Sequence, residues 1–194
     1  LDNANRLRGE DRYETSVAVV RQLQKETGNP KLPLIAVTGR DFPDAVSAGP
    51  AASSVGGAVV LVPSSAAQQE EVQGFFEGRD VSAVGGPAAR ALTAMGIEAT
   101  RVSSGKTRYG TAAAVAKDYF PGQRDVAYVA SGRLFPDALT AAVPAGILGV
   151  PVLLTASSSL PNETAEVLAT LDPDLVAVSG GKGAVGTQVL RSLQ

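Results

Sequence analysis

An α/β fold built from two tandem units is predicted by three features of this 194-residue sequence. The chain repeats itself, because the same short motifs return about 95 residues further on. Short apolar runs without polar alternation occur in each half and are typical of strands covered on both faces. Ala-rich segments long enough for helices separate these runs, which indicates small parallel sheets with helical crossovers.

The internal repeat is carried by motifs that keep their order in both halves. Three pairs share this behaviour: Arg12-Tyr13 and Arg108-Tyr109, Phe42-Pro43-Asp44-Ala45 and Phe135-Pro136-Asp137-Ala138, and Gly85-Gly86 and Gly180-Gly181. A near-constant offset over three motifs indicates a duplicated unit rather than chance similarity. We therefore predict one unit at residues 1–100 and a second at residues 101–194, joined near Thr100.

The elements of each unit can be predicted in order. Each unit opens with a helix, because apolar residues recur at helical spacing from Tyr13 to Leu23, after a plausible N-cap at Asp11, and from Tyr109 to Phe120. The predicted strands are 34–37, 59–62, 81–84, 126–129, 152–154 and 175–178, with one more at the joint in 97–102. The remaining predicted helices are 43–54, 66–77, 87–95, 136–148, 161–170 and 184–193. Each unit should hold a parallel sheet of three or four strands.

Composition excludes several classes of function. The chain contains no Cys and no His, which removes thiol and imidazole nucleophiles and the metal sites they build. A net charge of −2 gives no global field for nucleic acid, and no apolar run is long enough to span a membrane. Leu1 is not followed by a signal-type segment, so we expect any export signal to be removed or not included.

No cofactor is expected. The run 181–186 fits the glycine pattern of a dinucleotide site, but its copy at Gly86-Pro87-Ala88-Ala89 lacks the later glycines. Too little chain follows for the strand and ribose-binding acid that such a site requires. We predict no catalytic residue and no metal site.

The loops after the predicted strands are candidate ligand sites. Small hydroxyl and glycine residues follow each strand at 38–39, 64–65, 85–86, 131–132, 157–158 and 180–181. Such residues let backbone N–H groups approach a phosphate, carboxylate or sugar hydroxyl, which predicts an anionic or polyhydroxylated ligand. The alternative reading is that these are ordinary tight turns and helix caps.

The repeated charged residues suggest a framework for such a site. A Pro and an Asp in the first helical turn are typical of a helix N-terminus. The stabilisation that an exposed Asp gains from the helix dipole is small, so we expect a further role for this residue. We hypothesise that Asp44 pairs with Arg12 and Asp137 with Arg108, so that each guanidinium is held in place. Tyr13 and Tyr109 are better explained as core residues.

Together these motifs give a specific resemblance. The run from Arg6 to Thr15, then Phe42 to Ala45, Val59 to Val62 and Val84-Gly85-Gly86, resembles one repeat of the type 2 cell-wall-binding family, and the second half repeats it. This resemblance implies a secreted module of Gram-positive bacteria that attaches its protein noncovalently to anionic wall glycopolymers, such as a teichoic-acid-like polymer. It also implies flavodoxin-like or Toprim-like units with ligand grooves between neighbours.

The second copy departs from the family pattern. Lys106-Thr107 replaces Glu10-Asp11, and Ser104 is an insertion, so the second site is expected to be altered. Members of the family commonly carry three repeats in pseudo-threefold symmetry, and this chain has two. A third repeat or a homo-oligomer would complete such an assembly.

The predicted function is therefore noncatalytic attachment to the wall, at the cell wall or cell surface, with any enzyme located elsewhere in the parent protein. The candidate ligand-binding residues are Arg12, Arg40, Asp44, Gly85, Gly86, Arg108, Arg133, Asp137, Gly180 and Gly181. Two alternatives remain open. One is a self-assembling structural surface module, and the other is an enzyme that uses Asp44 or Asp137 on a wall sugar or nucleotide.

Overall fold

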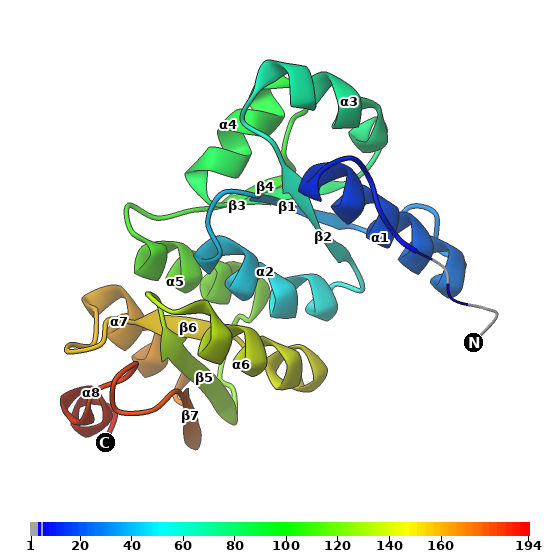
Figure 1. Cartoon of the computed structure of the whole chain (residues 1–194). Coiled ribbons are helices and arrows are strands. Elements are labelled where there is room, and N and C mark those ends of the chain that lie inside the picture. The colour runs from blue at the N-terminus through cyan, green and yellow to red at the C-terminus, as the bar shows by residue number, and fades with distance from the viewer. Residues whose placement is uncertain (1–3, 5) are drawn as a thin grey trace.

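The computed structural model describes residue 4 and residues 6–194, and it folds into two α/β units (Figure 1). The first unit holds a four-stranded parallel sheet in the order β2-β1-β3-β4. Its elements are α1 (Arg12–Thr27), β1 (Leu34–Thr38), α2 (Pro43–Ser54), β2 (Ala58–Val62), α3 (Ala66–Phe76), β3 (Val81–Val84), α4 (Gly86–Ala94) and β4 (Arg101–Ser103).

The second unit holds a three-stranded parallel sheet in the order β6-β5-β7. Its elements are α5 (Arg108–Tyr119), β5 (Val126–Ser131), α6 (Phe135–Leu148), β6 (Val152–Thr155), α7 (Asn162–Leu171), β7 (Leu175–Ser179) and α8 (Thr187–Ser192). β7 is the edge strand that corresponds to β3 in the first unit. β3 has β4 as its outer neighbour, and β7 has none among the residues that the structure describes.

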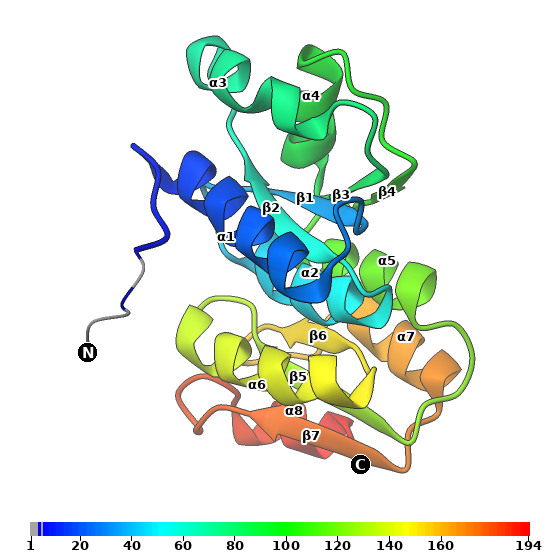
Figure 2. The same ribbon diagram turned by 90° about the vertical axis from the view of Figure 1, so that its right-hand side faces the viewer.

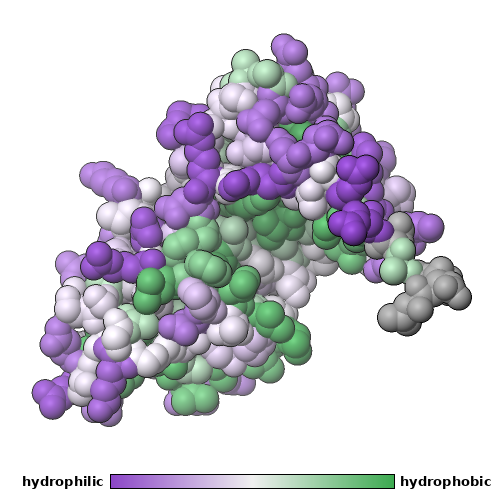
Figure 3. Space-filling view, in the orientation of Figure 1, coloured by the Kyte–Doolittle hydropathy of each residue, from purple (hydrophilic) through white to green (hydrophobic). Residues whose placement is uncertain are grey.

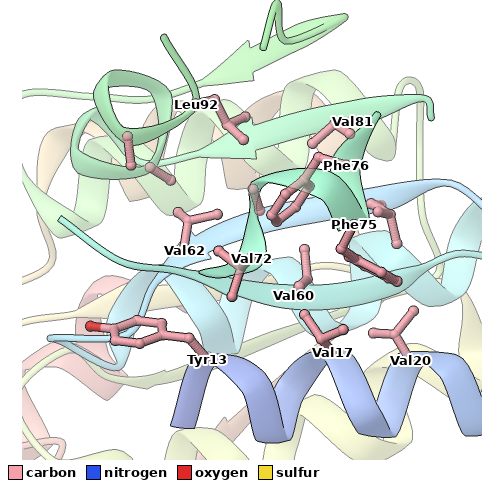
Figure 4. Packing of buried hydrophobic residues seen from close by; sticks show 14 of the residues in the cluster. Tyr13, Val17, Val20, Val60, Val62, Val72, Phe75, Phe76, Val81 and Leu92 are labelled. Carbon is pink, nitrogen blue, oxygen red and sulfur yellow. The ribbon is translucent and has the colours of Figure 1, made fainter. Parts of the chain in front are cut away.

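The main core of the first unit lies between the sheet and the helices α1, α3 and α4. Figure 4 shows Tyr13 and Val17 of α1 directed at the sheet, with Phe76 of α3 and Leu92 of α4 in the same cluster. Every residue of β1 is buried, because helices cover both faces of this central strand.

Helix α2 covers the opposite face of this sheet and packs against the second unit. Its small residues Ala48 and Ala51 contact the sheet, and α5 contributes Val115 to the same cluster. Val46 of α2 belongs to the cluster around β5 and β6. α2 lies against both α5 and α6, with α6 beside it over most of its length (Figures 1 and 2). Two of the hydrophobic clusters therefore draw residues from both units.

The sequence prediction of two small parallel sheets flanked by helices is confirmed, and most elements begin and end within two residues of their predicted bounds. Asp11 is the N-cap of α1, because its Oδ1 accepts hydrogen bonds from the backbone N–H groups of Tyr13 at 2.8 Å and Glu14 at 3.0 Å. Three bounds differ by more: α1 continues to Thr27, the joint strand is only Arg101–Ser103, and α8 begins at Thr187 because the residues before it form turns.

Candidate functional site

The Arg-Tyr motif at the start of α1 fastens the loop that follows β1. Arg12 Nη1 donates a hydrogen bond to the carbonyl oxygen of Gly39 at 2.7 Å. Tyr13 lies so close to Gly39 that a Cβ on this glycine would stand 2.5 Å from the ring. The residue after β1 must therefore be glycine for the tyrosine to pack here.

The second unit repeats this arrangement. Arg108 Nη1 donates to the carbonyl oxygen of Gly132 at 2.6 Å, and a Cβ on Gly132 would lie 2.7 Å from the Tyr109 ring. Tyr13 is buried, and Tyr109 packs against the core of the second unit. The prediction that both tyrosines are core residues is confirmed.

The repeated Asp of the Phe-Pro-Asp-Ala motif lies against the first glycine of the Gly-Gly turn. Gly85 has a φ of +88°, and a Cβ there would overlap the Asp44 carboxylate. Gly180 has a φ of +127°, and a Cβ there would lie 2.9 Å from Asp137 Oδ2. The two motifs are therefore in contact in each unit, although about 40 residues separate them in the sequence.

The ion pairs hypothesised within each unit are absent. Across residue 4 and residues 6–194, the salt bridges are Arg8 with Glu10 and Arg108 with Asp41. The pairing of Arg12 with Asp44 and of Arg108 with Asp137 was therefore wrong. Both arginines turn instead to the carbonyl of the glycine after the strand, as described above.

The ion pair that does form at the strand ends crosses between the units. Arg108 of the second unit lies with Nη2 3.4 Å from Oδ2 of Asp41, which belongs to the first unit. Asp41 Oδ1 accepts a hydrogen bond from the backbone N–H of Phe42 at 2.9 Å, which orients the carboxylate. Sequence reasoning did not select Asp41, because the equivalent residue in the second unit is Leu134.

Asp44 is the most electrostatically perturbed residue of this region. The pKa of Asp44 is raised from 3.8 to about 6, mainly by burial and next by the charge of Asp41, while the charge of Arg108 lowers it. Arg108 of the second unit therefore partly offsets the cost of holding the Asp44 carboxylate in its charged form.

These residues line a groove between the two units with a volume of about 200 Å³. One wall comes from the first unit, with Asp41, Asp44 and Gly86, and the other from the second, with Lys106 and Arg108. The groove joins the carboxyl end of one sheet to the start of α5, which is where ligands bind in open parallel sheets. The groove therefore offers both hydrogen-bond acceptors and cations to a ligand.

Arg40 stands at the end of β1, outside this groove. Its backbone N–H donates to Thr38 Oγ1 at 3.3 Å, and its side chain is exposed. It lines two neighbouring cavities of about 490 and 610 Å³ at the carboxyl edge of the first sheet. Arg12 lines the larger of the two. Arg40 is thus placed where a ligand can reach it.

The corresponding residues of the second unit are more open. Arg133 is exposed, and its backbone N–H donates to Ser131 Oγ at 3.2 Å, as Arg40 does with Thr38. Gly180 and Gly181 are also exposed, whereas Gly85 is buried and Gly86 partly so. The ten predicted residues therefore fall into two groups on the strand ends of two sheets, and only Asp44, Gly86 and Arg108 line the groove between the units.

Within residue 4 and residues 6–194, no group of three or more acidic, His or Cys side chains is placed to hold a metal ion. In the same residues, no helix combines the length and the apolar character needed to cross a lipid bilayer.

The chain matches one protein-family model twice, that of cell wall binding domain 2 (CWB2), at residues 6–91 and 102–190. It is 29% identical over 199 residues to N-acetylmuramoyl-L-alanine amidase LytC of Bacillus subtilis (strain 168), and the match covers 99% of this chain and 39% of that protein.

Two solved structures, Cwp6 and Cwp8 from Clostridium difficile, share the fold. Each has a TM-score of 0.76 and 22% sequence identity over 96% of this chain, and the match covers 30% of Cwp6 and 32% of Cwp8. The chain thus spans about a third of the length of the proteins it matches. The two family matches cover nearly the whole chain, in the two halves that the internal repeat defines, and the chain belongs to the cell wall binding domain 2 family.

Proposed function

We propose that this chain attaches a bacterial surface protein noncovalently to the cell wall by binding an anionic glycopolymer, such as a teichoic-acid-like chain. Membership of a cell wall binding family supports wall attachment. The observation that carries the choice of an anionic polymer is the duplicated, exposed arginine after the first strand of each unit. Arg40 and Arg133 form no salt bridge within residue 4 and residues 6–194.

The polymer is proposed to run along the carboxyl ends of both sheets and through the groove between the units. Arginine meets phosphate and carboxylate groups in a bidentate manner, and the backbone N–H groups near Gly86 and Gly181 add donors. Asp44, at the floor of the groove, would accept hydrogen bonds from sugar hydroxyls rather than meet the anionic groups. Two such sites on one rigid pair suit a repeating ligand, because binding at one site raises the effective concentration at the other.

The module is proposed to be noncatalytic. Asp44 and Asp137 lie in different units and each contacts a glycine of its own unit, which supports a structural role for each carboxylate in its own turn. The relative LytC is named as an amidase, and this chain matches 39% of that protein. We place any amidase chemistry in such proteins outside the matched part. Location at the cell wall or cell surface, after secretion, follows from the same proposal.

A further repeat, or a second copy of the chain, is proposed to cover the exposed face of α6. Figure 3 shows apolar side chains gathered over this helix. They include Leu139, Val143 and Ile147, with exposed fractions of 55, 62 and 81%. α6 is the repeat equivalent of α2, whose corresponding face is buried against the second unit. Among the residues that the structure describes, no strand pairs with the outer edge of β7, at the place that β4 occupies beside β3 in the first unit.

Wall attachment is tested by sedimentation of the purified chain with cell walls, before and after their anionic polymers are extracted. We expect retention before extraction and loss after it. The double variant Arg40→Ala, Arg133→Ala should lose retention in low salt. The matched control Lys25→Ala, Lys117→Ala removes two charges from the last turns of α1 and α5. The walls should retain this variant as they retain the wild type.

Two outcomes would overturn the proposal. Retention that survives extraction of the polymers would show that another wall component is bound. Equal retention of the arginine variant and the wild type would show that these guanidiniums do not contact the ligand. The structural alternative is separated by light scattering, since self-assembly at equal rates with and without wall extract would favour a surface-layer role. Turnover of wall fragments would favour the enzyme alternative.

A further inference from the structure

A cavity of about 490 Å³ lies at the strand ends of the first unit. It lies within that unit, between the loops after β1 and β2 and the helices α3 and α4, and it adjoins the groove between the units, since Asp41 and Pro87 line both. Two guanidinium groups line it, those of Arg40 and Arg90. Neither forms a salt bridge within residue 4 and residues 6–194.

Arg90 is positioned by the start of its own helix. It lies one turn after Gly86, and its Nη1 is 3.3 Å from the point that a Cβ on Gly86 would occupy. The side chain therefore folds back over the N-terminus of α4, where no side chain caps the backbone N–H groups. Guanidinium and helix N-terminus attract the same anionic group at this point.

Polar side chains complete the cavity. Thr38 and Gln69 line it and are buried, and Ser64 lines it and is exposed. The Gln69 amide nitrogen donates to the carbonyl oxygen of Pro63 at 3.1 Å, which fixes this side chain. Asp41 also borders the cavity, but its carboxylate is engaged by Arg108 and by the backbone N–H of Phe42. The two guanidiniums are the uncommitted charges.

The second unit has no counterpart of Arg90. The equivalent residue, counted from the Gly-Gly motif, is Val185, which is 1% exposed and belongs to the interior. The segment after Gly181 forms turns where the first unit begins α4. A position that carries a core valine in one copy and an exposed arginine facing a cavity in the other has changed its role.

We propose that this cavity is a binding site for a single compact anion, a phosphate or carboxylate group carried on a sugar or polyol, and that Arg90 determines its affinity. A cavity of this volume accommodates one sugar-sized unit. This site rests on the proposed wall attachment for its natural ligand. It would give the first unit a higher affinity for the polymer than the second unit.

The test is an NMR titration of the whole ¹⁵N-labelled chain with inorganic phosphate, glycerol 3-phosphate, glucuronate and neutral glycerol, at constant ionic strength. We expect saturable shifts at Ser64, Gly86 and Arg90 with anions and none with glycerol. The two phosphate probes and glucuronate distinguish phosphate from carboxylate as the preferred group. Arg90→Val, which copies the residue of the second unit, should weaken binding about tenfold or more.

Two further variants keep the test decisive. Arg90→Gln removes the charge but leaves a polar side chain at this exposed position, so it separates loss of the guanidinium from the effect of placing an apolar residue there. Lys182→Ala removes an exposed charge from the equivalent loop of the second unit and should leave phosphate binding unchanged. Unchanged affinity in both Arg90 variants, or equal shifts around Lys182, would overturn the proposal.

The two proposals fail separately. If the wild type is not retained on cell walls but its phosphate affinity depends on Arg90, wall attachment is wrong and the anion site stands. If the chain is retained on walls and phosphate affinity is independent of Arg90, the anion site is wrong and wall attachment stands.

Discussion

Arg108 and Asp41 form the ion pair that ties the two units together at the strand ends, with Nη2 and Oδ2 separated by 3.4 Å. Arg108 also holds the carbonyl oxygen of Gly132, so one side chain fixes a loop of its own unit and contacts the neighbouring unit. The geometry of the groove therefore depends on this residue. Its equivalent, Arg12, makes the contact within its own unit alone.

A double-mutant cycle between Asp41→Ala and Arg108→Ala should give a coupling energy below about 1 kcal/mol, because both side chains remain partly exposed. Arg108→Ala alone should destabilise the chain more than Asp41→Ala, since it also removes the bond to Gly132. Urea unfolding of the four proteins provides the measurement. A cycle between Arg12 and Asp44 serves as the control and should show no coupling.

Gly85→Ala should destabilise the chain by about 2–4 kcal/mol, because the alanine must adopt a positive φ and its Cβ overlaps the Asp44 carboxylate. Adding Asp44→Ala should recover part of this loss. Gly74→Ala in α3 is the matched control, since nothing lies within 4 Å of its Cβ, and it should be neutral or slightly stabilising. If both substitutions have the same effect on thermal unfolding, the contact between Asp44 and Gly85 does not constrain this turn.

Stability should depend on pH through Asp44. Its pKa is raised from 3.8 to about 6 in the folded chain, first by burial and then by Asp41, so folding favours the protonated form. The stability that this protonation contributes is fully present below about pH 4 and is lost as pH rises through 6. Asp44→Asn removes this dependence and should therefore gain stability over the wild type between pH 4 and pH 7.

Urea unfolding at four pH values across this range measures the difference between Asp44→Asn and the wild type. Asp137→Asn, the same change beneath Gly180, is measured in parallel as the matched substitution in the second unit. A difference for Asp44→Asn that shrinks as pH rises would contradict the assigned direction.

The repeat in the sequence was enough to predict the elements and the small parallel sheets, because each copy contains the signals for its own strands and helices. Contacts between the copies were not visible in it. Asp41 has Leu134 as its counterpart, so the internal repeat contains no signal for the residue that pairs with Arg108.

The sequence also predicted the wrong partner for Asp44, which lies against Gly85 and not against Arg12. The sequence shows that Asp44 and Gly85 both recur, but not that a glycine without Cβ makes room for the carboxylate. The strand at the joint, Arg101–Ser103, is shorter than the predicted 97–102. It pairs with the edge of β3, and its length is set by that pairing. Such contacts depend on the folded arrangement rather than on local propensity.

Wall retention should depend more than additively on the two exposed arginines. If both units grip one polymer, removing either Arg40 or Arg133 weakens binding by far more than half, since the avidity of about 10² to 10⁴ is lost with the second site. Single variants, the double variant and the wild type are compared by retention on walls over a series of salt concentrations. Simple halving of capacity with unchanged affinity would indicate two independent sites.

The apolar face of α6 gives the last prediction. Ile147 is 81% exposed and Val143 is 62% exposed, so replacing both by Lys removes apolar surface from water without opening the core. We expect unchanged thermal unfolding at low protein concentration and reduced self-association or reduced docking of an added repeat, measured by sedimentation velocity. Ala138→Lys is the contrasting variant, because this residue of the same helix is 0% exposed, and it should unfold the second unit. If Ile147→Lys with Val143→Lys leaves association unchanged, the covering partner binds elsewhere.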